Sequence, residues 1–438
     1  MAFSRRFLSI LMCVFFASLG AFGGGEAEKG AAAAEQPVTI QVWVQADAVR
    51  YPGFEAVSAE FEKQFSNISV EPTNVPGGWG DLYRKLLAGY VSKTWPDVLY
   101  AKGYALVDFA QRGMLTDLSD YWNNDKGSKL NASPVFHKHV EQGSSYKGKV
   151  YGLPRGQYWF SLAHNLDLFK QAGVAKAPET WEEFRQTANK ISKLGPDIHG
   201  FAMYTYTRAD STGAETMLDI WTKQNGGSIM EYDGAKPVYS LAGNKKAEEA
   251  LSFLHANLYK DKSFLPADLD GSRDSLIFAN QVGMWWAHGG HISRFAKAAP
   301  DLNYTIAPMP GHPKRTAYIA DQKWMVSGLT KYKRQSWEYI SFFTSKDAEA
   351  MFAPYEGHIS VWQDNWSLPV YQHPGYQGLI KQLQLPDTEA FAIHPGWNET
   401  RSAIAGEVQK VLFDKVTSAE ALKAAQKAAD AALADITF

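Results

Sequence analysis

The first third of the chain alternates between strand and helix patterns. Residues Val38–Val44 are rich in β-branched side chains at alternate positions, which predicts a strand. Apolar residues then recur at helical spacing over Pro52–Phe65, which predicts an amphipathic helix. The rhythm continues with strands at Ile68–Pro72 and Val98–Tyr100 and helices at Asp81–Tyr90 and Tyr104–Gly113. It indicates an α/β domain with a mainly parallel sheet, in which ligands bind beyond the carboxyl ends of the strands.

A second α/β unit begins near residue 150. Phe160–Ala163 reads as a strand, and Thr180 with Glu183 forms a capping box before a helix over Phe184–Leu194. Val282–Ala287 predicts a buried strand that runs into a glycine turn. Further helices are expected over Glu215–Gln224, Lys245–Tyr259, Lys331–Thr344 and Ala419–Leu433. The pattern therefore predicts two α/β units.

The N-terminus has the pattern of a secretory signal. Arg5 and Arg6 precede an apolar run over Phe7–Phe22, and the run is shorter than the roughly 20 residues that a spanning helix needs. We expect a signal peptide over residues 1–23 and a flexible tether over 24–36, with an uncleaved anchor as the alternative. The mature protein is then expected in the periplasm or at the cell surface.

Composition narrows the function classes. The 438 residues carry 44 Lys plus Arg against 46 Asp plus Glu, a net charge of -2 that disfavours nucleic acid as a partner. The single cysteine, Cys13 in the leader, excludes a disulfide framework, a cysteine zinc site and an iron–sulfur site. We expect no cofactor and no metal. The 14 Trp, 21 Tyr and 24 Phe supply either a large core or flat surfaces for a ligand.

The order of short motifs resembles the bacterial extracellular solute-binding proteins of ABC importers, in the maltose-binding-like sugar class. The motifs span nearly all of the mature chain: Val38–Trp43, Phe61–Phe65, Ile68–Glu71, Trp95–Val98, Tyr151–Pro154, Asn165–Phe169, Thr180–Glu183, Gly283–Trp286, Tyr304–Gly311, Trp337–Ser345 and Glu420–Leu422. The resemblance implies two hinged lobes that close on a ligand without chemistry.

The same resemblance implies where the lobes and partners lie. The N-terminal lobe is expected over residues 37–150 and 306–345, and the C-terminal lobe over 151–305 and 346–438. The partners are a carbohydrate and the membrane permease subunits of the importer, since the chain has no P-loop to supply energy itself. We expect a monomer.

Sugars need aromatic faces and polar groups, and several residues offer them on their own pattern. Trp79 stands among glycines, where few local neighbours can bury it, so we favour a platform for a sugar ring. The strand at Trp285-Trp286 is expected to bury one ring and present Trp286. The Gly289-Gly290 pair lets backbone approach a ligand closely, although the family often has Gly-x-Trp there. His288 is a polar candidate; with His291 it could suggest a metal, but no third ligand is near.

The resemblance implies further contacts. It points to Gln45 and Asp47 after the first strand, Lys102 after the third, Tyr158 at the hinge, Arg208 in a loop of the second lobe and Trp397 before the last helices. Asp321 follows a strand on the return to the first lobe and could accept hydroxyl hydrogen bonds. Helix capping by Asp47, a surface role for Lys102 and Arg208, and packing of Trp397 stay open as alternatives.

Three functions compete. A sugar-binding receptor fits the resemblance best, and the Trp count favours an oligosaccharide. A secreted glycoside hydrolase also needs an aromatic cleft, but it requires two carboxylates about 5–10 Å apart, and no motif marks Asp47 and Asp321 as such a pair. A receptor for a peptide, a polyamine or glycerol phosphate is the third. An anionic ligand calls for clustered cations, and at the strand ends the sequence offers only Lys102 and Arg208. We therefore expect a binding protein and no enzyme.

Overall fold

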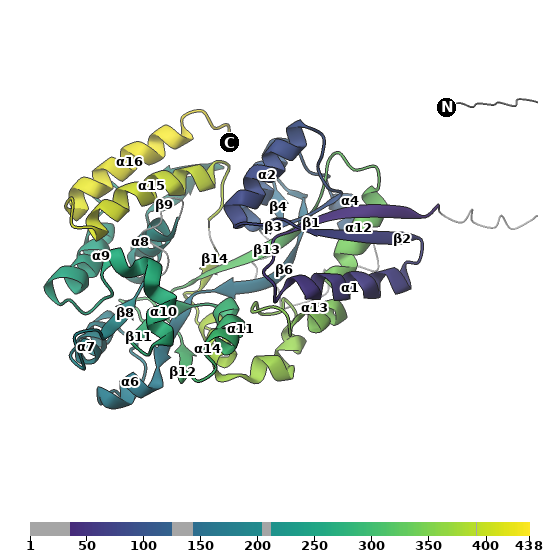
Figure 1. Cartoon of the computed structure of the whole chain (residues 1–438). Helices are drawn as coiled ribbons and strands as arrows, with labels where there is room; N and C mark the ends of the chain where they lie inside the picture. Colours follow the sequence, from purple (N-terminus) through teal and green to yellow (C-terminus); the bar gives the residue numbers. More distant parts are fainter. Residues whose placement is uncertain (1–35, 125–142, 204–211, 391) are drawn as a thin grey trace, which may run out of the picture. The chain divides into compact units, whose positions relative to one another are not determined.

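The computed structural model describes residues 36–124, 143–203, 212–390 and 392–438. The expected signal peptide, the tether and Arg208 lie outside these ranges and stay predictions. Two larger sheets, each with its own helices, organise residues 37–438 (Figure 1). In the part of the chain that the structure describes, no helix has the length and apolarity needed to cross a membrane.

The first sheet has the order β14-β13-β3-β1-β2, with β6 also paired to β13. Its strands β1, β2 and β3 are parallel, whereas β13 runs antiparallel to β3 and β6. The bounds are β1 Val38–Val44, β2 Ile68–Asn74, β3 Val98–Lys102, β6 Gly152–Trp159, β13 Tyr318–Val326 and β14 Glu389–Ala390. Helices α1 Tyr51–Gln64, α2 Trp79–Val91, α3 Gly103–Gln111, α4 Ser119–Asn124, α12 Lys333–Phe343 and α13 Lys346–Phe352 accompany it.

Side chains that alternate along the strands form a separate apolar layer on each face of this sheet. Tyr100 and Trp324, which face each other across β3 and β13, pack on α1 and α12, while Leu99 and Met325 pack on α2 and α3. Successive side chains of a strand point to opposite faces of the sheet, and helices cover both faces of this sheet. The strand residues Val98–Ala101 are therefore all buried.

The second sheet has the order β12-β7-β11-β8. Its strands are β7 Ser161–Asn165, β8 His199–Ala202, β11 Val282–Ala287 and β12 Tyr304–Ala307. Its helices are α6 Leu166–Gln171, α7 Trp181–Ser192, α8 Gly213–Gln224, α9 Lys245–His255, α10 Arg273–Phe278, α11 Gly289–Ala298, α14 Pro374–Leu383, α15 Trp397–Leu412 and α16 Ser418–Leu433. Only β8 and β11 are parallel; β7 runs antiparallel to both neighbours. The α/β class is confirmed, and this sheet is mixed rather than mainly parallel.

Short pieces complete the described residues. They are the hairpins β4 Ser145–Tyr146 with β5 Lys149–Val150 and β9 Met230–Asp233 with β10 Lys236–Tyr239, the π-helix Ala256–Lys260, and the 3-10 helices Ala267–Ser272, Gln363–Ser367 and Pro369–Gln372. The helix predicted over Lys245–Tyr259 thus changes from α to π after His255.

The chain crosses from the first sheet to the second through a single residue. Phe160 is the one residue between β6, which belongs to the first sheet, and β7, which belongs to the second. The chain returns between β12 and β13. These crossings agree with two lobes joined at a hinge; the residue limits given above for the lobes stay a prediction.

A buried ion cluster braces the crossing strand β6. The Arg155 guanidinium, 2% exposed, donates to Glu356, lies 3.9 Å from Glu349 and receives the face of Phe352 at 3.7 Å. Burial raises the pKa of Glu356, but Arg155 and His358 outweigh it and hold that pKa well below its usual range. Because a buried charge is tolerated only when paired, the cluster fixes the segment around Glu356 against β6.

Candidate functional site

A cavity of about 1540 Å³ lies where strands of both sheets end and helices begin. From the first sheet it is lined by Asp47–Arg50, the start of α2 and the start of α3. From the second it is lined by the starts of α8, α11 and α15. This is the position that the strand–helix pattern predicts for a ligand, and the volume exceeds that of ordinary small-molecule pockets, which is about 300–1,000 Å³.

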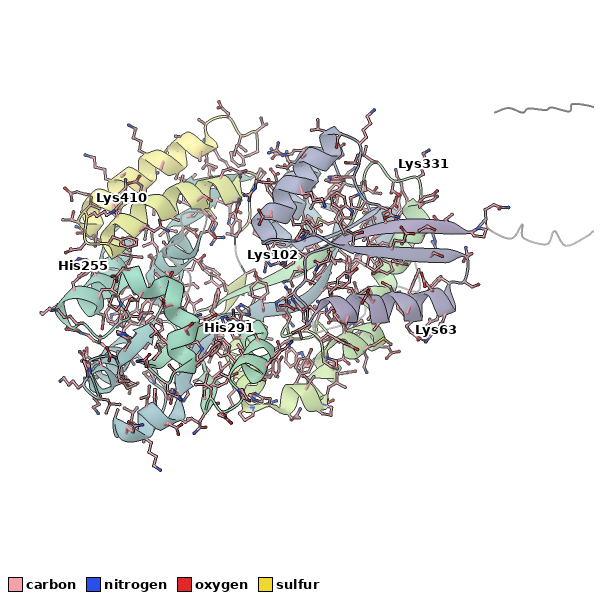
Figure 2. The ribbon with its side chains drawn as sticks, in the orientation of Figure 1. Lys63, Lys102, His255, His291, Lys331 and Lys410 are labelled. Carbon is pink, nitrogen blue, oxygen red and sulfur yellow. The ribbon has the colours of Figure 1, made fainter. Side chains whose placement is uncertain are left out.

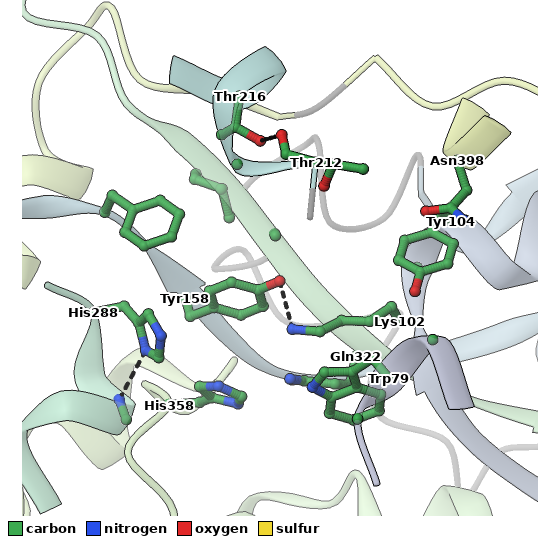
Figure 3. Close-up of a pocket in the computed structure, with 18 of the residues that line it drawn as sticks. Trp79, Lys102, Tyr104, Tyr158, Thr212, Thr216, His288, Gln322, His358 and Asn398 are labelled. Atoms are coloured by element: carbon green, nitrogen blue, oxygen red, sulfur yellow. Dashed lines mark hydrogen bonds between the residues drawn. The ribbon is translucent and has the colours of Figure 1, made fainter. Parts of the chain in front are cut away.

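Three predicted residues meet at the first-sheet side of the cavity (Figure 3). The Lys102 ammonium lies 4.9 Å from the ring centroid of Trp79 and 3.9 Å from that of Tyr158, and it donates to the Tyr158 hydroxyl at 2.6 Å. Trp79 and Tyr158 are both half-buried. We call these three residues the first wall. Figure 2 shows Lys102 in the interior, in contrast to Lys63 and Lys410 at the periphery.

His358 and His288 lie next to Tyr158 and add polar side chains to the cavity lining. The Tyr158 ring stacks on His358 at 4.9 Å and lies 5.6 Å from His288. His288 caps α11 by accepting from the Gly290 backbone at 3.1 Å, and His291 accepts from the His288 backbone at 3.2 Å. Burial first, and then neighbouring charged or histidine side chains, lower the pKa of both His288 and His291 well below the usual value, so both are neutral bases. Within the described ranges, no group of three metal-ligating side chains is found.

On the second-sheet side, Trp286 and Trp397 line the cavity, and we call them the second wall. Trp286 is only 1% exposed and lies in the core, where it stacks on Trp221 at 6.4 Å and packs on Phe160 at 5.6 Å. Trp286 lines the cavity and Trp285 does not, so the role of Trp286 as a ligand contact stays a prediction, but both rings are buried. The reason is that helices cover both faces of the second sheet.

Trp397 has two partners of its own. Tyr104 of α3 stacks on it at 5.4 Å with the rings 29° apart, and the Arg401 guanidinium lies 4.0 Å from its ring centroid. Trp397 is 7% exposed. Because α3 belongs to the first sheet and α15 to the second, this stack joins the two halves away from the crossing strands.

The remaining predicted residues lie in different settings. Asp47 lines the cavity and also accepts from the backbone N–H groups of Val49 and Arg50 at 3.0 Å, in the turn before α1. It is not the helix cap that the alternative expected, since the N-cap of α1 is Arg50 and carries no side-chain cap hydrogen bond. Gln45 donates to the Gly77 carbonyl at 3.0 Å and supports the loop before Trp79. Gln45 is absent from the lining.

The glycine pair serves a close approach between two chain segments. A Cβ at Gly289 would meet the carbonyl oxygen of Gly357 at 1.4 Å, so only glycine fits there. Gly290 lines the cavity, whereas Gly289 is absent from the lining. Asp321 was expected to follow a strand, but it lies inside β13 opposite Gln157 because the strand continues to Val326; its side chain is outside the description.

Charged residues that the sequence reasoning missed also line the cavity, and they occur as ion pairs. Arg84 pairs with Asp81 at 2.6 Å, Arg294 pairs with Asp274 at 2.7 Å, and Arg401 pairs with the buried Glu215. Arg50 likewise pairs with Asp47 at 3.3 Å and Arg273 with Asp274 at 2.7 Å. The spacing of Arg84 from Asp81, of Arg50 from Asp47 and of Arg273 from Asp274 is visible in the local sequence. Only the fold brings Arg294 to Asp274 and Arg401 to Glu215.

One further lining residue was missed. Gln322 of β13 is fully buried, and neither atom of its carboxamide has a hydrogen-bond partner among the described residues. Its neighbour Asp321 is the predicted residue, because a carboxylate expected at the end of a strand could accept hydroxyl hydrogen bonds.

Comparisons with known proteins match this architecture. The family model of the bacterial extracellular solute-binding proteins matches residues 45–350. A putative binding protein of Brucella abortus is 27% identical over 87% of this chain and 90% of its own length. The sn-glycerol-3-phosphate-binding periplasmic protein of Brucella melitensis is 23% identical over 86% of this chain and 89% of its own.

Solved structures share the fold at lower identity. An ABC substrate-binding protein of Listeria monocytogenes in complex with cycloalternan superposes with a TM-score of 0.78 at 20% identity, covering 91% of this chain and 100% of that one. The sugar-binding protein MalE of Xanthomonas citri gives 0.77 at 20% identity, covering 91% and 98%. The family model covers the second sheet, the first sheet except β1 and β14, and most of the cavity lining, so the chain belongs to the bacterial extracellular solute-binding proteins.

Proposed function

We propose that this protein is the receptor of an ABC importer and that it captures a neutral oligosaccharide in the cavity by closure of its two lobes. The observation that carries the proposal is the first wall, where Trp79 and Tyr158 offer rings beside the polar atoms of Lys102. Sugar recognition needs this combination of apolar faces and hydrogen-bonding groups. The cavity volume of about 1540 Å³ suits several sugar rings.

The charge pattern supports a neutral ligand. The arginines of the lining are engaged by carboxylates, as with Arg294 and Asp274 at 2.7 Å and Arg84 and Asp81 at 2.6 Å. A phosphate would have to compete with these carboxylates for the guanidinium groups. Glycerol phosphate, the ligand in the name of one relative, is therefore the second candidate.

A binding role is also supported by the carboxylates. A glycosidase needs one carboxyl group of raised pKa at the cleft to act as an acid. Burial raises the pKa of the carboxyl groups of Glu215, Asp219 and Glu349, and these three residues do not line the cavity.

Export and partners complete the proposal. The N-terminal pattern favours a secreted protein, in the periplasm or at the cell surface, that delivers its ligand to the permease subunits. A monomer suffices for this role, because one chain supplies both sides of the cavity.

A thermal-shift screen tests the function. The arms are monosaccharides, linear and cyclic oligosaccharides of two to six rings, and glycerol 3-phosphate, each followed by chromatography of the sugar. We expect stabilisation by an oligosaccharide that is recovered intact. Stabilisation by glycerol 3-phosphate alone would reject the neutral ligand, and shortened sugar would reject the receptor.

A further inference from the structure

Gln322 lies in the floor of the cavity between two strands that carry charged neighbours. In β13 it is directly opposite Lys102 of β3 on one side and Arg155 of β6 on the other. Directly opposite residues of antiparallel strands point to the same face of the sheet, so the three form one row. Figure 3 shows Gln322 beside Trp79, with Lys102 and Tyr158 next to them.

The carboxamide of Gln322 differs from those of the two other described glutamines that are 0% exposed, Gln224 and Gln382. Gln224 accepts from Trp181 at 2.9 Å and donates to the Thr316 carbonyl at 3.2 Å. Gln382 accepts from the Met309 backbone at 2.6 Å and donates to the Arg315 carbonyl at 3.0 Å. All three glutamines are 0% exposed. Both glutamines with a structural role are thus satisfied at both ends of the amide.

Gln322 alone of these three lines the cavity, and neither its Nε2 nor its Oε1 has a partner among the described residues. A buried amide without partners lowers the stability of the unliganded protein, because it has lost its hydrogen bonds to water. Such a group at the wall of a ligand cavity is explained most simply by partners that the ligand provides.

We propose that Gln322 is a specificity-determining residue whose carboxamide donates to one hydroxyl and accepts from a neighbouring hydroxyl of a sugar ring on the first wall. The inference rests on the proposed function. A carboxamide is suited to this task, since it carries a donor and an acceptor a short distance apart. The ligand class is therefore a sugar with an adjacent hydroxyl pair in the ring that reaches the floor.

Access to Gln322 involves Lys102. Its ammonium lies over the rings of both Trp79 and Tyr158, and Lys102 is the cross-strand neighbour of Gln322. A sugar ring that stacks on Trp79 takes the place of this ammonium and brings its hydroxyls to the floor. A ligand that leaves the amide unpaired is then rejected, as in other sites built to read a hydroxyl group.

The test compares Gln322→Met with the matched control Gln382→Met. The probe is the oligosaccharide that stabilises the wild type most in the screen above. We expect Gln322→Met to match or exceed the wild-type melting temperature without ligand and to bind the probe at least about tenfold more weakly. Gln382→Met should melt at a lower temperature, because it breaks satisfied hydrogen bonds, and should keep wild-type affinity.

Deoxy analogues of the probe provide a second measurement. Removal of a hydroxyl that Gln322 contacts should weaken binding to the wild type but not to Gln322→Met, because the interaction is already lost. Unchanged affinity in Gln322→Met, or a loss of unliganded stability as large as in Gln382→Met, overturns the inference while the proposed function stands. If no carbohydrate binds the wild type, the proposed function fails, and the inference fails with it.

Discussion

The two walls of the cavity use tryptophan in opposite ways. In the first wall, Trp79 is half-buried and shares the space with a lysine ammonium at 4.9 Å. In the second wall, Trp286 is 1% exposed and stacked in a core, and Trp397 is held by Tyr104 and Arg401. Rings of the first wall have a polar, exchangeable neighbour, whereas those of the second wall already pack on protein.

The difference shows that the number of tryptophans around a cleft is not the number of rings on which a ligand can stack. A ring becomes a platform only where its neighbours can leave, and a lysine side chain leaves far more easily than a core aromatic pair. We therefore propose that a ligand stacks on the first wall and that the second wall supports the cleft.

The largest expected effect separates the walls by stability. Trp286→Ala removes a buried indole from the second-sheet core and should lower the free energy of unfolding by about 3–5 kcal/mol. Trp79→Ala should lower it by about 1 kcal/mol or less, because the side chain is half-buried at a helix start. Urea unfolding followed by circular dichroism measures both values. Equal losses in the two variants would contradict the distinction.

Acid should weaken the half that holds the second wall. Burial lowers the pKa of His164 and of His394 to about 4, against about 6.5 in the unfolded chain. The unfolded state then binds more protons, so their contribution to stability is complete above pH 6.5 and is lost as the pH falls towards 4. At pH 5 the loss is about 2 kcal/mol for each histidine.

Unfolding at pH 7.5 and pH 5.0 measures this dependence, with His164→Leu as the comparison variant. The variant should show a pH effect smaller by about 2 kcal/mol, since it has removed one of the titrating groups. Residues 38–124, which hold strands β1, β2 and β3 of the first sheet, contain no histidine. An unchanged pH effect in His164→Leu would assign the acid sensitivity to other groups.

Local chemistry explains which parts of the fold were predictable. The capping box before α7 is present, with Glu183 donating its backbone N–H to Thr180 at 3.1 Å. The helix predicted from Asp81 begins at Trp79 instead, because Asp81 caps the backbone of Gly78 at 2.8 Å from inside the first turn. Periodicity and caps act within a few residues, so the sequence displays them.

Residues of the site could be predicted from the sequence only where their position in or after a strand brings them to the cavity. Lys102 and Tyr158 follow or occupy strands and do meet Trp79. The burial of Trp286 and the unpaired amide of Gln322 depend on helices and strands distant in sequence. Such properties belong to packing, and a single sequence does not show them.

A smaller effect concerns affinity at the first wall. Trp79→Ala should weaken binding of the oligosaccharide by about tenfold or more, because the ring face is lost, and Trp79→Phe should recover part of it. Titration calorimetry measures the affinities. Trp366 is also half-buried but is absent from the lining, so Trp366→Ala serves as the control and should bind normally. Equal weakening in both alanine variants would point to a general loss of structure.

The smallest expected effect concerns the stack between Tyr104 and Trp397, which joins the two halves at 5.4 Å. An aromatic pair of this kind contributes about 0.5–1.5 kcal/mol. Tyr104→Ala should therefore speed ligand dissociation by about twofold to tenfold in stopped-flow fluorescence, because the closed arrangement loses one contact. Tyr104→Phe keeps the ring and should dissociate at the wild-type rate. Tighter binding by Tyr104→Ala would instead show that the freed Trp397 face takes up sugar, and the second wall would then bind ligand as the first does.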